Sequence, residues 1–343
     1  MTGKQDLAWW IKNLKSQNGQ IFSVNHQSTV RLSTDASMTG WGAHCNGQTA
    51  QGKWNLLQQT EHINVLEITA ALMGLRSLIK QENIQVILET DNTPTIAYLI
   101  KMGGTKNSKM TSISKKIWEW CISHKITLMP VHIPGIENVI ADKQSRIFRD
   151  FSDWKLSSQT FQKINSRRGP LSMDLFASTW NTQLPQFFTW NNQPDSRGVD
   201  ALSQPWPKSQ AYAFPPFSMI PHVMRKVQRD QSTIVLVTPI WPSQTWYQNL
   251  IHMSCRDPLV IPHSPNLLMD INNSPHPLIT EERLKLAVWR VSGEKCKVLG
   301  YQSRLLKSSL TSIEHQQAWL TTMPGINGLA GVTKRKLIFF KPL

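Results

Sequence analysis

The stretch IQVILETDN, residues 84–92, is the clearest guide to the fold of the N-terminal half of the chain. Its first seven residues, 84–90, form a short, mostly apolar run that is followed directly by Asp91. This run predicts a strand buried within a sheet. Three earlier segments also predict strands, joined through Gly and Asn turns. These segments are residues 29–34 (TVRLST), 40–45 (GWGAHC) and 48–56 (QTAQGKWNL).

The segments between and after these strands predict helices. From Glu61 to Lys80 the apolar residues recur with the 3.6-residue period of a helix that packs on a sheet. Two more helices are predicted over residues 95–102 and 112–124, then a fifth strand over 126–133 and a last short helix over 137–148. The order β-β-β-α-β-α-α-β-α predicts an α/β fold with a mixed five-stranded sheet and flanking helices.

Four acidic residues occupy places in these elements where a carboxylate is costly. Asp35 directly follows the first strand, and Asp91 ends the apolar strand. Glu67 lies on the apolar stripe of its helix, and Asp142 lies on the last helix. A charge on a core-facing position needs a cation or a hydrogen-bonded partner, and we find no similarly placed lysine or arginine. Clustered carboxylates are the ligands that hard divalent cations require.

Taken singly, each of these residues has an ordinary explanation. An aspartate at a strand end is more often a turn residue or a helix cap. Glu67 could lie at the edge of the apolar stripe, and Asp142 could be a surface charge. The prediction of a metal site therefore depends on the four residues together.

The four carboxylates stand in motifs that resemble the ribonuclease H family. The motifs are STDAS (33–37), HINVLEITAAL (62–72), LETDN (88–92) and HIPGIENVIADKQSR (132–146). The resemblance covers roughly residues 28–148 and implies a ribonuclease H-like sheet. It also implies an enzyme that cuts the RNA strand of RNA–DNA hybrids.

The resemblance implies which residues would act. Asp35, Glu67, Asp91 and Asp142 would hold two Mg²⁺ ions about 4 Å apart, with Mn²⁺ as a substitute. One ion would activate a water, and the other would stabilise the leaving 3′-oxygen.

Three further residues near these motifs are candidate site residues. The resemblance implies that His132 assists proton transfer or product release, although it could instead be a structural histidine at a strand end. Asn92 would contact the RNA backbone or cap the following helix. Ser37 is a small polar residue beside Asp35 and is a candidate contact to the 2′-hydroxyls of the RNA strand.

The sequence departs from the family in two places. Where the family has an apolar residue in the last helix, this chain has Gln144. Between Met102 and Ser108 there is little room, so the basic protrusion of some cellular members is missing, which resembles retroelement versions of the domain. The strings TDASMTGWGAHCNG (34–47) and AWWIKNLKSQNGQ (8–20) resemble tyrosine-recombinase retrotransposons of the DIRS type. In that group the ribonuclease H follows a reverse transcriptase, which would be a partner.

The second half of the chain continues this resemblance. MDLFASTWNTQLPQFFTW (173–190), VDALSQPW (199–206) and YAFPPF (212–217) are similar to the methyltransferase-like domain of these elements, a second and smaller α/β unit. An active methyltransferase of this type has Asp or Asn before Pro-Pro-aromatic, to hold the target amino group. Here the position is Phe214, and Asp174 is a weak candidate for cofactor contact. We therefore expect a structural or nucleic-acid-holding unit.

These observations predict five segments. Residues 1–27 would be the remnant of a reverse transcriptase connector and 28–150 the ribonuclease H domain. Residues 151–172 would be a linker, 173–263 the methyltransferase-like domain and 264–343 a poorly structured basic tail.

Composition limits the remaining possibilities. No run of apolar residues is long enough to span a membrane, and the first residues are too polar for a signal peptide. The four cysteines lie far apart, which argues against a zinc site and fits an intracellular protein of the cytoplasm or nucleus. The net charge of +15 is spread along the chain and favours a polyanionic partner.

Three other functions stay open. A catalytically silent fragment could bind hybrid or tether a polymerase. An integrase or junction resolvase of similar fold has a different acidic order, so Glu67 disfavours it. A methyltransferase is disfavoured by Phe214.

Overall fold

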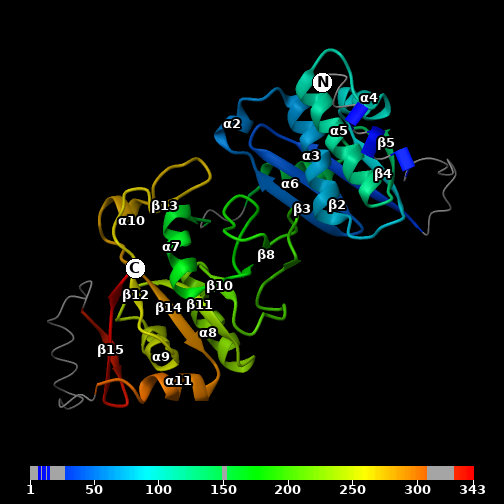
Figure 1. Ribbon diagram of the computed structural model, residues 1–343. Helices are drawn as coiled ribbons and strands as arrows, with labels where there is room; N and C mark the ends of the chain where they lie inside the picture. The colour runs from blue at the N-terminus through cyan, green and yellow to red at the C-terminus, as the bar shows by residue number, and fades with distance from the viewer. Residues whose placement is uncertain (1–6, 9, 13, 16–27, 149–152, 307–327) are drawn as a thin grey trace.

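The computed structural model describes residues 7–8, 10–12, 14–15, 28–148, 153–306 and 328–343. Most of the predicted connector over residues 1–27 lies outside these ranges. The described chain contains two large sheets that follow one another along the sequence, and Figure 1 shows them in separate units. Two further sheets have two strands each, β6 (Lys155–Leu156) with β13 (Leu268–Met269) and β15 (Leu329–Thr333) with β16 (Lys336–Phe339). No helix within the described ranges is both long and apolar enough to cross a membrane.

The first unit is the mixed five-stranded sheet with flanking helices that the sequence predicts. Its strand order is β3-β2-β1-β4-β5. Strand β4 pairs in parallel with β1 and β5, whereas β2 pairs antiparallel with both β1 and β3. Its elements are β1 (Thr29–Ala36), β2 (Gly40–Cys45), β3 (Gln48–Lys53), α2 (Leu56–Gln59), α3 (Ile63–Leu78), β4 (Gln85–Thr90), α4 (Thr93–Ile100), α5 (Ser108–Ser123), β5 (Thr127–His132) and α6 (Val139–Arg146).

Two helices cover opposite faces of this sheet. Successive side chains of a strand point to opposite faces, and Leu32 and Thr34 of β1 face α3, where Gly74 lies against them. On the other face α6 lies directly on β2, because a Cβ at Gly42 would be 2.2 Å from the carbonyl oxygen of Ala141. The apolar core fills the space between the sheet and α3, α4 and α5.

The position of α6 depends on Gly42, which pairs in register with Asp35. Asn138, just before α6, donates a 2.9 Å hydrogen bond to the carbonyl of Thr34 in β1. These contacts hold α6 beside the end of β1, where Asp35 lies.

The second unit contains an eight-stranded sheet of order β17-β12-β14-β11-β10-β7-β8-β9. All seven residues of its central strand β11 are buried. The elements of this part are β6 (Lys155–Leu156), α7 (Ser158–Arg168), β7 (Met173–Asp174), β8 (Gln186–Thr189), β9 (Gly198–Val199), β10 (Ala211–Ala213), η1 (Phe217–Met219), α8 (Ile220–Arg229), β11 (Thr233–Pro239), α9 (Thr245–Met253), β12 (Leu259–Val260), β13 (Leu268–Met269), α10 (Pro277–Thr280), β14 (Leu286–Ser292), α11 (Lys295–Gln302), β15 (Leu329–Thr333), β16 (Lys336–Phe339) and β17 (Lys341–Pro342).

The secondary structure corrects two of the predicted segments. The segment predicted as a linker, residues 151–172, contains the helix α7, whose Phe161 and Ile164 are buried. The segment predicted as a poorly structured tail, 264–343, contributes β14, which pairs with β11 along its full length. Six of the seven residues of β14 are buried, and Phe340, directly after β16, packs into the same core. Residues 307–327 of the predicted tail lie outside the described residues.

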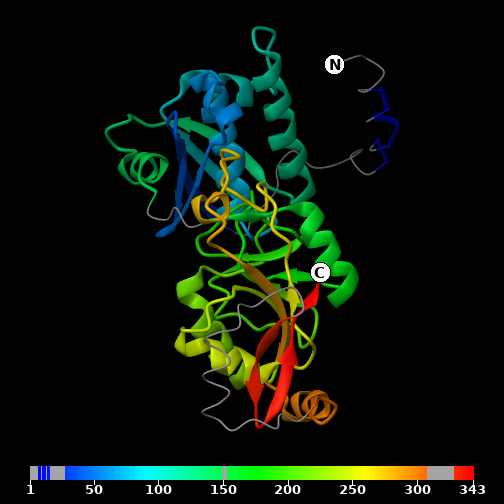
Figure 2. The same cartoon turned by 90° about the vertical axis from the view of Figure 1, so that its left-hand side faces the viewer.

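The second unit extends away from the first. Figure 2 shows α11 and the hairpin of β15 and β16 at its far end. The two units contact one another through Arg76 on α3 and Asp195, whose charged groups are 2.6 Å apart. Asn192 also donates a 3.0 Å hydrogen bond to the carbonyl of Thr49 in β3.

The contact between Gly42 and α6 predicts a packing defect. We expect Gly42→Ala to lower the free energy of unfolding by about 1–3 kcal/mol, because the new methyl group meets backbone atoms that cannot rotate away. Chemical unfolding followed by circular dichroism measures this. Gly300→Ala on α11, where a Cβ meets nothing within 4 Å, is the control and should be neutral or stabilising. Equal stability of Gly42→Ala and the parent protein would contradict this packing.

Candidate metal centre

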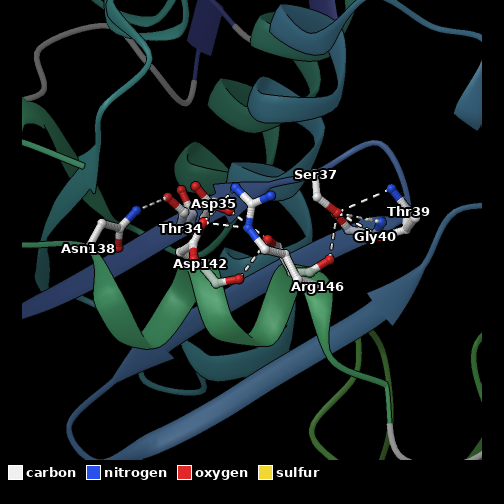
Figure 3. A network of polar contacts seen from close by, with 9 residues as sticks. Thr34, Asp35, Ser37, Thr39, Gly40, Asn138, Asp142 and Arg146 are labelled. Atoms are coloured by element: carbon white, nitrogen blue, oxygen red, sulfur yellow. Dashed lines mark hydrogen bonds and ion pairs between the residues drawn. The ribbon is translucent and has the colours of Figure 1, made fainter. Parts of the chain in front are cut away.

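The end of β1 places Asp35 in a buried position. Its side chain is 5% exposed and accepts a 2.6 Å hydrogen bond from the hydroxyl of Ser145 on α6. Burial raises the pKa of Asp35 to about 6, and the charges of Asp142 and Asp91 also raise it, whereas the bond from Ser145 lowers it. Asp35 is therefore held between β1 and α6, as Figure 3 shows.

Glu67 lies on α3, which covers the opposite face of the sheet from α6. Its carboxylate nevertheless lies close to that of Asp35. Glu67 is 5% exposed, and its Oε2 atom is buried without a hydrogen-bond partner. Burial raises the pKa of Glu67 to about 9, with further contributions from the charges of Asp35 and Asp91, while the amide of Ala36 donates a hydrogen bond that lowers it. In the metal-free protein Glu67 is thus protonated at neutral pH.

Asp91 completes a group of three carboxylates. It follows β4, the parallel neighbour of β1, so that the two aspartates lie at the same edge of the sheet. One ligand oxygen each from Asp35, Glu67 and Asp91 lie within 4.8 Å of one another. Asp91 itself is exposed to solvent, which leaves the group open on one side.

Gly135 lies against this group, and our sequence analysis did not identify it. A Cβ at Gly135 would be 2.8 Å from the Oδ2 atom of Asp91. The loop after β5 therefore approaches the carboxylate closely, and any larger residue would push against it. A glycine three residues after His132 is the sequence signal that could have indicated such an approach.

Asp142 lies near the three carboxylates but forms an ion pair with Arg146. Its Oδ1 atom accepts a 2.7 Å hydrogen bond from Nε of Arg146, one turn along α6. Figure 3 shows Arg146 beside both Asp142 and Asp35. The expectation that no lysine or arginine is placed near the carboxylates is therefore wrong. The spacing of four residues on a helix could have indicated this pair.

The structure places the three other predicted site residues around this centre. His132 is exposed at the end of β5 and pairs in register with Thr90, the residue before Asp91. Asn92 caps α4, since its side chain accepts from the amide of Thr95 and donates to Asn64.

Ser37 is engaged within the chain. It is buried, and its hydroxyl donates a 2.7 Å hydrogen bond to the carbonyl of Ser145. The same oxygen accepts bonds from the amides of Thr39 and Gly40 in the turn between β1 and β2. A contact of Ser37 or Asn92 with nucleic acid stays a prediction.

The donor set of the group suits a hard divalent cation. All three ligand groups are carboxylates, and Mg²⁺ prefers oxygen ligands. In the part of the chain that the structure describes, none of the three forms an ion pair. A cation would also give the orphaned Oε2 of Glu67 a partner. These residues therefore fit a bound metal ion.

The predicted methyltransferase-like motif gives no comparable centre. Phe214 follows β10 and packs against the apolar core, with its ring 6.3 Å from that of Phe217. Asp174 on β7 is 2% exposed, and burial raises its pKa to about 7. Its Oδ2 atom accepts from the amide of Gln183, while Oδ1 is buried without a partner.

Comparison with known proteins gives matches among solved structures only. No protein-family model matches the chain, and no curated protein matches it. The solved structure of RNase H1 from Halobacterium salinarum is 14% identical, with a TM-score of 0.28 over 34% of this chain and 93% of that one. An RNase H1 in complex with an RNA/DNA hybrid is 16% identical, with a TM-score of 0.28 over 34% and 91%.

A viral polyprotein is also among the matches. The protease–reverse transcriptase of prototype foamy virus is 14% identical, with a TM-score of 0.23 over 45% of this chain and 22% of that one. The matched structures are thus RNase H1 proteins and a viral protease–reverse transcriptase.

The raised pKa of Glu67 predicts how stability depends on pH. Without metal, the folded protein keeps a proton on Glu67 up to about pH 9, whereas the unfolded chain loses it near pH 4.5. Stability should therefore fall as the pH rises between these values, and Glu67→Gln should remove this loss. At pH 8 in a chelating buffer we expect the variant to be more stable than the parent by at least about 1 kcal/mol.

Chemical unfolding at pH 5 and pH 8 measures this difference. Glu119→Gln, a change on α5 at a half-exposed glutamate, is the matched control and should not alter the pH dependence. A difference between Glu67→Gln and the parent that is the same at both pH values would rule out a buried protonated carboxyl.

The ion pair between Asp142 and Arg146 predicts competition with a divalent cation. Removing the guanidinium frees Asp142 and takes a positive charge away from Asp35 and Glu67. Arg146→Ala should therefore tighten Mn²⁺ binding about 2- to 5-fold, measured by calorimetry. Lys143→Ala removes a charge from the same helix and serves as the control. Equal effects of the two variants would show that only net charge matters.

Proposed function

We propose that this chain is a metal-dependent ribonuclease H that hydrolyses the RNA strand of RNA–DNA hybrids during reverse transcription. The observation that carries the proposal is the group of Asp35, Glu67 and Asp91. These residues come from β1, α3 and the end of β4, and their ligand oxygens lie within 4.8 Å of one another. The protein keeps two buried carboxylates together at a cost in stability, which a structural role does not require.

Asp35, Glu67 and Asp91 would hold Mg²⁺, and Asp142 would join them at a second ion. Bound Mg²⁺ would neutralise the charge of the scissile phosphate and make a water more acidic. Ser145 fixes Asp35 through its 2.6 Å hydrogen bond, and the amide of Ala36 fixes Glu67. Both buried carboxylates are therefore held in place before substrate binds, which favours catalysis.

The residues around the centre support roles in handling the substrate. His132 is exposed next to the strand end that carries Asp91, where its ring could carry a proton to or from the leaving group. Asn92 and Ser37 would order the loops that face the RNA strand, whose 2′-hydroxyls distinguish it from DNA. The overall charge of +15 favours binding of a polyanionic duplex.

We also propose that the chain derives from a DIRS-type retrotransposon polyprotein. The motif strings and the order of acidic residues support this origin, with residues 28–150 as the nuclease domain and 173–263 as a degenerate methyltransferase-like domain. The reverse transcriptase of the same element would be its partner. The proposal implies an intracellular protein, in the cytoplasm or the nucleus.

Cleavage of a labelled RNA–DNA hybrid tests the proposal. We expect Mg²⁺-dependent cleavage of the RNA strand, with RNA–RNA and DNA–DNA duplexes left intact. Asp91→Asn removes an exposed ligand with little change in shape and should lower the rate on the order of a hundred-fold or more. Asp195→Asn, an exposed aspartate in the second unit, should cleave like the parent.

Two results would count against the nuclease. One is a folded parent protein that cleaves no hybrid in Mg²⁺ or Mn²⁺, which would favour a silent binding or polymerase-tethering fragment. The other is cleavage that persists in Asp91→Asn, which would point to a contaminating nuclease.

A further inference from the structure

The second unit contains a pocket lined by five cations from four parts of the chain. It has a volume of about 740 Å³, which is enough for a nucleotide-sized ligand. Figures 1 and 2 both show α7 and the C-terminus close together here. The cations are Arg167 and Arg168 at the end of α7, Arg256 before β12, Arg304 after α11 and Lys341 in β17.

These five cations share the described pocket lining with one carboxylate, that of Asp257. None of them forms an ion pair there. The one carboxylate in the lining, Asp257, accepts a 2.6 Å hydrogen bond from the hydroxyl of Tyr301. Arg167 and Arg168 donate instead to the carbonyls of Pro342 and Asp257, and Nε of Arg168 is buried without a partner.

Keeping these charges together costs free energy. Burial lowers the pKa of Arg168 to about 10, and the charges of Arg256 and Arg290 lower it further, while the charge of Asp257 raises it. Burial lowers the pKa of Arg290 as well, and Arg256 adds to that effect. The repulsion between cations in a half-buried space is relieved if an anion occupies the pocket.

The ends of two helices account for only part of this arrangement. A helix C-terminus carries about half a negative charge and favours nearby cations such as Arg168 and Arg304. Two helix ends thus offset about one of the five positive charges. Arg256 and Lys341 belong to no helix, so a helix end does not explain their position.

We propose that this pocket binds clustered phosphates, either those of a nucleic-acid backbone or the phosphate chain of a free nucleotide. Arginine suits phosphate because its planar guanidinium donates two parallel hydrogen bonds. Every lining residue belongs to the second unit, whereas the carboxylate group belongs to the first. A test of phosphate binding is therefore independent of a test of the proposed nuclease activity.

Calorimetric titration of the full chain with inorganic tripolyphosphate in a chelating buffer tests the pocket directly. The double variant Arg256→Ala/Arg304→Ala changes two exposed residues and should lower the affinity at least about ten-fold. The matched control, Arg225→Ala/Arg283→Ala, removes two exposed cations of the same unit outside the pocket and should stay within about two-fold of the parent.

Circular dichroism checks that each variant is folded, and Arg256→Ala alone replaces the double variant if that one unfolds. The proposal is overturned if the parent protein does not bind tripolyphosphate. Equal losses in the pocket and control variants would also overturn it, because net charge alone would then explain binding.

A labelled single-stranded DNA distinguishes the two sources of phosphate. If tripolyphosphate displaces the DNA, and the pocket variant shows a salt dependence reduced by about 1.4 in log–log slope, the pocket holds two backbone phosphates. If the DNA binds the parent and the pocket variant equally while tripolyphosphate binding is lost, the pocket serves a free nucleotide. Both results support clustered phosphates as the ligand.

Discussion

The first unit is organised by the burial of two carboxylates, Asp35 and Glu67, at one end of its sheet. Each is 5% exposed, burial raises the pKa of both, and the charge of Asp35 raises the pKa of Glu67 further. Such a pair weakens the fold unless a proton or a cation is present. The hydrogen bond from Ser145, the close approach of α6 at Gly42 and the anchoring of Asn138 all serve to hold this end of the sheet together.

Much of the first unit could be predicted because its signals are local. The apolar period of residues 61–80 and the run over 84–90 are long enough to identify a helix and a strand. The edge that brings Asp35 and Asp91 together follows from parallel β1 and β4. The approach of Gly135 to Asp91 was missed because it depends on how the loop after β5 lies against the sheet. The pair of Asp142 with Arg146 was missed although the spacing of four residues on one helix indicates it.

The second unit was harder because its core is assembled from distant segments. β14, residues 286–292, is central to the sheet, yet it contains Arg290 and lies in a region whose pattern is weak. The side chain of Arg290 donates to the carbonyls of Arg168 and Ser209, and no local signal indicates those partners. α7 escaped prediction for a similar reason, because only Phe161 and Ile164 of its eleven residues are buried.

The most direct test of the account is a crystal structure of the protein grown with Mn²⁺, with anomalous scattering used to locate the ion. We expect an anomalous peak for one Mn²⁺ ion between Asp35, Glu67 and Asp91, with Oε2 of Glu67 among the ligands of the ion. A well-ordered structure at saturating Mn²⁺ that shows the three carboxylates without a peak would contradict it. Glu67 would then be a protonated structural residue, and the three carboxylates would no longer support the proposed nuclease.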